Sequence, residues 1–226
     1  IDGSVFKVNQ LKERTTLGIR SRSPRWAIAG KFKAQQVTTK VTGIMASIGR
    51  TGAITPVAQL EPVNVGGVNV TNATLHNQDE VDRKDVRIGD TVILQRAGDV
   101  IPEVVKVILE KRDKKSVQYL LPKECPSCEK TIYRPKGESV ARCQNLSCPA
   151  QIKGRIIHFI SKSALNIDGF GEKLVDQLVE KNIIRRVDDI FKLTFEKLEK
   201  LDRMAEKSAN NILGAINDSK KTTFAR

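Results

Sequence analysis

The sequence of 226 residues predicts a multidomain α+β protein that contains a small β-barrel, a four-cysteine metal module and a helical segment. Three observations predict this fold class. The spacing of apolar residues changes along the chain from the alternation of strands to the 3.6-residue period of helices. All four cysteines lie together between these two regions. Aromatic residues make up only 4% of the chain, which argues against one large core.

Residues 1–35 predict two short strands in a strongly basic segment. The stretches Ser4–Val8 and Trp26–Phe32 alternate in the manner of strands, and the alternation places Lys31 and Lys33 on the same face. This segment holds eight basic and two acidic residues, nearly half of the net charge of +13. Because such a charge attracts polyanions, we expect a strongly anionic ligand here.

Residues 36–121 predict a small closed β-barrel of the oligonucleotide-binding kind. Short β-branched runs alternate with turn residues, and a short helix is expected at Asn72–Arg83. The runs are Val41–Ile48, Ile54–Leu60, Val63–Val70, Thr91–Gln95 and Val104–Leu109. Five or six short strands over about 85 residues suit a small closed Greek-key barrel.

The four cysteines predict a structural zinc site within residues 122–149. Cys125, Cys128, Cys143 and Cys148 follow the spacing C-x2-C-x14-C-x4-C, and thiolates at this spacing are typical ligands of a tetrahedral Zn²⁺. The alternative is a pair of disulfides in a secreted scaffold. That alternative needs a small cysteine-dense chain, whereas the other 222 residues here contain no cysteine. Because four sulfurs fill the zinc shell, the sequence predicts a metal that supports the fold and does not react.

Residues 150–226 predict short helices joined by two related turns. A helix-hairpin-helix is expected at Ile167–Gly171, where Gly169 and Gly171 let the backbone approach a phosphate and the next helix offers free N–H groups. A weaker second copy at Leu198–Lys207 makes this segment a repeat of about 35 residues. The alternative for one isolated copy is an ordinary corner between helices. Two copies in a basic chain favour DNA binding.

The overall charge and the cysteine usage restrict the class of partner. A net charge of +13 favours nucleic acid or an anionic membrane surface as the ligand. No apolar stretch approaches the ~20 residues of a membrane span, and no signal peptide opens the chain. A lone thiolate cluster fits a reducing compartment. We therefore expect a soluble, cytosolic protein that acts on nucleic acid.

Two groups of residues at strand junctions of the barrel are candidate DNA contacts. Arg50, Thr51 and Arg96 lie beside flexible glycines, so an arginine here can reach a phosphate. Val100 and Ile101 would then lie against the sugars or base edges of a shallow minor groove. The alternative is turn chemistry together with two core aliphatic residues, and the residues alone do not decide between these interpretations.

Lys7 and Lys31 are candidate residues of a phosphate pocket. Each lies in a predicted strand, and an arginine-rich stretch separates them. The alternative is that both are ordinary solvated lysines, since lysine is rarely buried. His76 and His158 are expected to pack or form hydrogen bonds, because the zinc ion already has four sulfur ligands.

Six stretches of the chain carry motifs of a known family. They are Asp2–Asn9, Trp26–Phe32, Gly49–Ala58, Asn72–Asn77, Arg96–Pro102 and the four-cysteine window. These motifs, in this order, resemble those of the bacterial NAD-dependent DNA ligases, and the resemblance extends through the whole chain. It implies an enzyme that takes AMP from NAD onto a lysine and passes it to the 5′-phosphate of a nick. The 3′-hydroxyl then attacks and releases AMP.

The resemblance also implies roles for individual residues. Lys7 and Lys31 match two lysines that contact the adenylate phosphate, where fixed cations stabilise the charge of phosphoryl transfer. Asp2 matches an acidic residue that helps to hold Mg²⁺ or Mn²⁺. Gly30 and Lys33 depart from the Phe and Pro of the family pattern. The candidate barrel residues match contacts around the nick.

The resemblance implies a division of the chain and a set of partners. We expect the end of a nucleotidyltransferase domain at 1–35, an OB-fold at 36–121, a zinc finger at 122–149 and a partial helix-hairpin-helix domain at 150–226. The expected cofactors are NAD, Zn²⁺ and Mg²⁺ or Mn²⁺, and the expected partner is nicked double-stranded DNA, with no membrane. We expect a monomer in the bacterial cytoplasm that serves DNA replication and repair.

The nucleophile motif of the family, K-x-D-G, has no complete copy in these residues. We therefore expect an internal-to-C-terminal piece of a ligase that binds nicked duplex and does not adenylate itself. The alternative is a non-catalytic DNA-binding repair scaffold with the same modules. A K-x-D-G motif upstream of Asp2 would favour the ligase.

Overall fold

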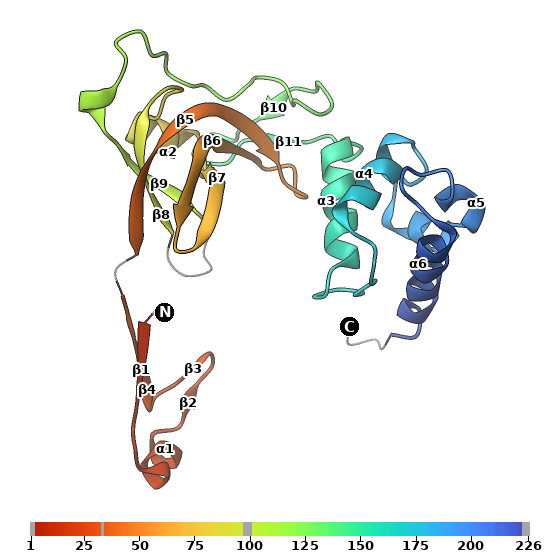
Figure 1. Ribbon diagram of the computed structural model, residues 1–226, viewed down its shortest axis with the longest axis horizontal. Coiled ribbons are helices and arrows are strands. Elements are labelled where there is room, and N and C mark those ends of the chain that lie inside the picture. Colours follow the sequence, from red (N-terminus) through yellow and green to blue (C-terminus); the bar gives the residue numbers. More distant parts are fainter. Residues whose placement is uncertain (1–2, 33, 97–100, 223–226) are drawn as a thin grey trace. The chain divides into compact units, whose positions relative to one another are not determined.

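The computed structural model describes residues 3–32, 34–96 and 101–222, without the side chain of Arg96 (Figure 1). The described chain divides into two compact units. The first contains residues up to 45 together with 57–76 and 80–119. The second contains 46–56, 77–79 and all residues from 120 onward, so the facing ends of two barrel strands belong with the cysteine module.

The N-terminal segment forms a hairpin. The two predicted strands are present as β1 (Gly3–Lys7) and β4 (Ala27–Lys31), and they pair antiparallel with each other. Between them lie helix α1 (Leu11–Leu17) and the short strands β2 (Ile19–Arg20) and β3 (Ser23–Pro24). Arg14 of α1 holds this connecting segment against the ends of the two strands. Its Nε donates to Val8 O at 2.6 Å, and its guanidinium lies 4.9 Å from the centre of the Trp26 ring.

The barrel is closed and five-stranded, which confirms the predicted architecture. Its strands follow the order β5-β6-β7-β9-β8. They are β5 (Gln35–Ile48), β6 (Ile54–Val65), β7 (Val68–Thr74), β8 (Thr91–Arg96) and β9 (Glu103–Val107), with α2 (Gln78–Lys84) between β7 and β8 and the 3-10 helix η1 (Leu109–Lys111) after β9. Val41, Ala58, Leu94 and Val104 are fully buried in its core. Inward-facing β-branched and aliphatic residues thus fill the barrel, as period-2 alternation requires.

Several predicted element bounds in the barrel are wrong, since β5 begins at Gln35 and not at Val41, and β6 continues beyond Leu60 to Val65. The run Val63–Val70 is not one strand, because Gly66 and Gly67 take φ values of 59° and 82° and turn the chain between β6 and β7. Val65 pairs with Val68 across this two-residue turn, whose double positive φ only glycine adopts without strain. The helix expected at Asn72–Arg83 begins instead at Gln78, because β7 continues to Thr74.

A buried ionic network joins the segment after the barrel to the barrel itself. The Asp90 side chain is fully buried and accepts hydrogen bonds from Arg112 Nε at 2.8 Å and Nη2 at 2.7 Å, and from the Arg87 backbone at 2.8 Å. Arg87 and Arg112 also bond Asp85, and hydrogen bonds from these arginines lower the pKa of Asp85. Each buried charge therefore has a counter-charge, without which its burial would be strongly unfavourable.

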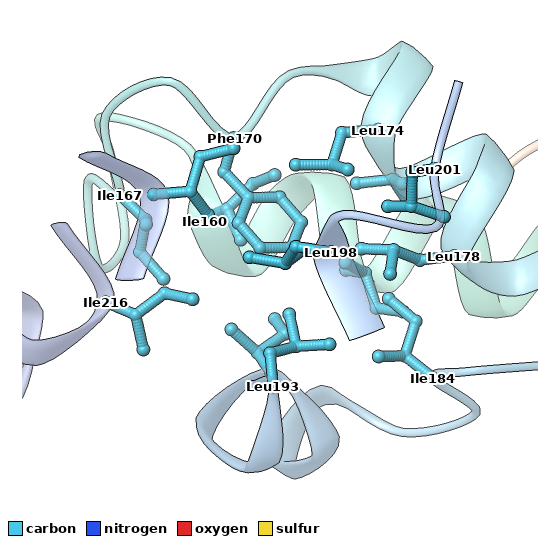
Figure 2. Close-up of a cluster of buried hydrophobic side chains, with 14 of the residues drawn as sticks. Ile160, Ile167, Phe170, Leu174, Leu178, Ile184, Leu193, Leu198, Leu201 and Ile216 are labelled. Carbon is cyan, nitrogen blue, oxygen red and sulfur yellow. The ribbon is translucent and has the colours of Figure 1, made fainter. Parts of the chain in front are cut away.

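The second unit contains a small two-stranded sheet and a helical core. The sheet pairs β10 (Ile132–Tyr133) with β11 (Arg142–Cys143). The helices are α3 (Pro149–Ile160), α4 (Glu172–Glu180), the 3-10 helix η2 (Val187–Lys192), α5 (Phe195–Leu198) and α6 (Glu206–Ser219). Figure 2 shows apolar side chains from these helices and from the turns between them gathered into one cluster, including the buried Phe170, Leu178 and Leu198.

The helical segment shows the predicted internal repeat in its backbone. Helix α4 begins at Glu172 and α6 begins at Glu206. Three residues before each of these positions the chain takes a left-handed conformation, at Gly169 (φ 72°) and at Arg203 (φ 60°). The two turns therefore share a left-handed residue at the same place before the helix, although only the first has glycine there, and the first has a further left-handed residue at Asn166 (φ 52°).

We predict that Arg112→Met destabilises the barrel by about 3 kcal/mol, because the buried Asp90 carboxylate loses its counter-charge. Native-state hydrogen exchange of the Val92 and Leu94 amides measures this change locally. The matched control is Arg83→Met, which removes an exposed ion pair with Glu80 on α2 and should leave this exchange nearly unchanged. Equal exchange in the Arg112 variant and in the wild type would contradict the prediction.

Candidate functional site

The four cysteines converge on one point in the second unit. Their sulfur atoms all lie within 4.8 Å of one another. The Sγ atoms of Cys125 and Cys148 are 3.8 Å apart, and those of Cys128 and Cys143 are 3.6 Å apart. Tetrahedral zinc with Zn–S bonds of about 2.3 Å places its sulfurs about 3.8 Å from each other. The residues present therefore fit a closed zinc site that keeps no open position for water or substrate.

Local backbone geometry directs the cysteine sulfur atoms toward their common centre. A turn after Cys125 returns the chain, with the Cys125 N–H donating to Lys130 O and the Glu129 N–H donating to Cys125 O, both at 2.8 Å. At the other end of the window, Cys148 is the N-cap of α3 and Pro149 takes the first helical position. Proline suits that position because its missing N–H has no helical partner to lose.

The surroundings of the thiols shift their pKa values in different directions. Burial raises the pKa of Cys125 to about 12 and also raises that of Cys143. At Cys128 burial acts in the same direction, but hydrogen bonds from the Asn145 side chain and the Lys130 backbone outweigh it and lower the pKa to about 7. Because zinc binds thiolates, metal binding must release protons from the buried thiols, and the affinity rises with pH.

The turn between β5 and β6 is joined to this cysteine module. The Cys143 N–H donates to Gly52 O and the Ile54 N–H donates to Ala141 O, both at 2.8 Å. Buried Gln151 on α3 donates from Nε2 to Cys143 O at 2.8 Å and to Asn145 O at 3.1 Å. The end of a barrel hairpin thus continues the small sheet of the zinc module.

Arg50 and Thr51 occupy the two central positions of that turn. The turn is closed by the Gly52 N–H, which donates to Gly49 O at 2.9 Å. Both side chains are exposed, and Thr51 Oγ1 lies 3.5 Å from Arg142 Nη1. The structure therefore presents two of the predicted contact residues together, with the cation of Arg142 beside them.

The other barrel candidates are only partly described. Val100 lies outside the described residues, as does the side chain of Arg96, whose backbone ends β8. Ile101 is 70% exposed, so it is not the core aliphatic residue of the alternative interpretation. His76 has a φ of 63° and places its Nε2 3.3 Å from Glu103 Oε2, as expected for a hydrogen-bonding histidine.

Lys7 and Lys31 lie on one face of the N-terminal hairpin. Lys7 pairs with Ala27 and Lys31 pairs with Gly3, so four residues of strand separate the two lysines. This spacing corresponds to about 13 Å along the strand. Both side chains are exposed, whereas Asp2 and Lys33 lie outside the described residues.

The helical turns present their backbones differently. In the first, Gly169 and Gly171 are exposed on either side of the buried Phe170, and Gly171 is the N-cap of α4. In the second, Gln177 of α4 bonds both backbone groups of Asp202, accepting from its N–H at 2.8 Å and donating to its carbonyl at 3.3 Å. Gly169 and Gly171 of the first turn are thus exposed before α4, with the Gly169 N–H donating to Asp168 Oδ1 at 3.0 Å, and the second turn is held against α4.

The sequence did not point to Gln151 or Gly154 of α3, whose neighbours in the structure include Gly52 and Arg50 of the turn between β5 and β6. A glycine in the middle of a helical pattern was an available signal for Gly154, because such a glycine weakens a helix unless packing requires it. Gln151 gave no comparable signal.

In the part of the chain that the structure describes, no helix is both long enough and apolar enough to cross a membrane.

Three family models match this chain in consecutive order. Residues 1–35 match the NAD-dependent DNA ligase adenylation domain, residues 38–116 match the NAD-dependent DNA ligase OB-fold domain, and residues 124–150 match the NAD-dependent DNA ligase C4 zinc finger domain. Together the matches extend over more than half of the chain.

We predict that removing zinc uncouples the turn between β5 and β6 from the cysteine module. Treatment with 1,10-phenanthroline should lower the melting temperature and speed hydrogen exchange at the Ile54 amide, because the free energy of structural zinc binding is part of the folding free energy. The non-chelating isomer 1,7-phenanthroline is the control. Unchanged melting and exchange after complete zinc removal would show that the metal does not support this joint.

Proposed function

The chain belongs to the NAD-dependent DNA ligase family, and we propose that it contributes nick binding and part of the adenylate pocket to a nick-sealing reaction. The observation that supports this most directly is the order of three matching ligase domains in one chain of net charge +13. The match of residues 1–35 to an adenylation domain favours a ligase over a non-catalytic repair scaffold.

In the proposed reaction, an adenylyl group from NAD passes to the enzyme and then to the 5′-phosphate of a nick, which the 3′-hydroxyl attacks. Lys7 and Lys31 share one face of their hairpin, and we assign them to the adenylate phosphate. Two ammonium groups at the adenylate phosphate would stabilise the negative charge of phosphoryl transfer. Asp2 is proposed to help hold Mg²⁺ or Mn²⁺, which would neutralise phosphate charge.

The polar contacts proposed here go to phosphates and carry no sequence information, whereas Val100 and Ile101 are proposed to lie against sugars or base edges. Arg50 and Thr51 project from an exposed turn, and Gly169 and Gly171 expose backbone at the start of α4. Together with Arg96, Val100 and Ile101, these residues are proposed to bind nicked duplex. Zinc takes no part in the chemistry because its four sulfur ligands complete its shell.

We further propose the division of the chain expected from its sequence. The nucleotidyltransferase end occupies 1–35, the OB-fold 36–121, the zinc finger 122–149 and a helix-hairpin-helix domain begins at 150. The two related turns of the helical segment support this last assignment. The proposed setting is the bacterial cytoplasm, where a monomer would act in DNA replication and repair.

The DNA-binding proposal predicts that Arg50→Ala weakens binding of nicked duplex and flattens its salt dependence. Loss of one phosphate contact should reduce the slope of log Kobs against log[salt] by about one. Fluorescence anisotropy with a nicked hairpin duplex at several salt concentrations measures both quantities. The control Arg83→Ala removes an exposed arginine of α2 that is not among the proposed contacts. If the Arg50 variant keeps the wild-type slope, Arg50 serves the turn alone.

The absence of a complete K-x-D-G motif from these residues predicts that this chain does not adenylate itself. Incubation with NAD and Mg²⁺ should leave its mass unchanged, because the family's nucleophilic lysine is not among the 226 residues. Intact-mass spectrometry detects a covalent AMP adduct directly. A stoichiometric adduct would contradict the prediction and place a nucleophile within this chain.

A further inference from the structure

Helix α3 contains a glycine in its middle, at Gly154. Glycine in a helix interior costs about 0.5–1 kcal/mol relative to alanine, because it loses more backbone freedom on folding. Helix α6 also contains an interior glycine, Gly214, around which a Cβ atom would meet nothing within 4 Å. The two glycines therefore differ in their surroundings, and only Gly154 has a packing reason.

The packing reason for Gly154 is the backbone of Arg50. A Cβ atom at Gly154 would lie 3.0 Å from both Arg50 Cα and Arg50 Cβ, and 3.2 Å from Arg50 N. These atoms belong to the backbone and the first carbon of the side chain, so a Cβ atom at position 154 requires the Arg50 backbone to give by a few tenths of an ångström. Alanine at position 154 would therefore shift Arg50.

The same helix connects this contact to the metal module. Cys148 is the N-cap of α3 and one of the four converging thiols. One turn further, Gln151 donates to two backbone carbonyls of the zinc loop. Gly154 lies three residues beyond Gln151 and therefore on the same face of the helix. One face of α3 thus fixes both the zinc loop and the turn that carries Arg50.

We propose that Gly154 is a positioning residue for DNA binding, because its missing side chain lets Arg50 settle against α3 and sets the direction of the guanidinium. This inference rests on the proposed contact between Arg50 and a DNA phosphate. Gly154 itself does not touch DNA in this proposal. The zinc site contributes to nick binding through α3, which carries Gly154 at a fixed place relative to the thiolates.

The test compares Gly154→Ala, Arg50→Ala and the double variant in binding of a nicked hairpin duplex. We expect Gly154→Ala to lower affinity roughly tenfold and to reduce the salt slope by about one, as Arg50→Ala does. Because both changes remove the same contact, the double variant should bind no worse than Arg50→Ala alone. A generally loosened protein would not reproduce the salt slope of a single lost phosphate.

The control Gly214→Ala places the same methyl group in an interior position of α6 with open space around it. It should bind DNA as the wild type does, with an unchanged slope. Zinc content and the amide NMR signals of Arg50 and Thr51 are measured in the metal-loaded variants. We expect Gly154→Ala to retain zinc and to shift both amide signals, and Gly214→Ala to shift neither.

Three outcomes would overturn the inference, and they are distinguishable. If Arg50→Ala flattens the salt slope but Gly154→Ala does not, Arg50 contacts DNA without help from Gly154, and the proposed function stands. If Arg50→Ala leaves the slope unchanged, the proposed phosphate contact itself fails. If Gly154→Ala loses zinc or leaves the amide signals in place, Gly154 does not act through Arg50.

Discussion

The second unit depends on helix α3, because residues of this one helix contact the metal cluster, the turn that carries Arg50, helix α4 and the helical core. Cys148 begins the helix and supplies a thiol to the metal cluster. Lys153 forms ion pairs with Asp176 and Glu180 of α4, at 2.9 and 2.8 Å. Ile156 and Ile160 are buried in the helical core. Since one rigid helix carries all these contacts, the metal cluster and the helical core cannot shift independently along it.

Features that depend on short stretches of chain were predictable from the sequence. The cysteine spacing predicted the thiol cluster, because each pair of ligands lies within one turn. Short β-branched runs between turn residues predicted the barrel strands, and alternation predicted the two N-terminal strands but not their pairing. The prediction of one strand at Val63–Val70 was wrong because β-branched residues continue on both sides of the turn at Gly66 and Gly67. The apolar pattern alone therefore did not indicate that the chain reverses there. Local backbone conformation decided that boundary.

Features that depend on contacts between residues far apart in the sequence were not predictable, although the residues themselves are plain in the sequence. Asp90 and Arg112 look like loop residues in the sequence, and only the closed barrel brings them into a buried pair. Gly154 looks like a weak point of a helix, and only the fold places Arg50 against it. Charge complementarity and close approach each involve two residues from different segments. The pattern of one segment therefore cannot predict which residue of another segment will lie against it. The basic excess of residues 1–35 likewise predicted an anionic ligand but not the shared face of Lys7 and Lys31.

The two helical turns show how one backbone conformation can be held by different means. At the first turn Gly169 adopts φ 72° without strain, because it has no Cβ atom. At the second turn Arg203 adopts φ 60°, a conformation that costs a residue with a side chain roughly 1 kcal/mol. Gln177 bonds both backbone groups of the preceding Asp202, and this pair of hydrogen bonds offsets such a cost. The second turn is therefore held by a side chain of α4, whereas the first is held by backbone hydrogen bonds to the end of α3, from the Asn166 N–H to Ser161 O at 2.9 Å and from the Ile167 N–H to Ile160 O at 3.0 Å.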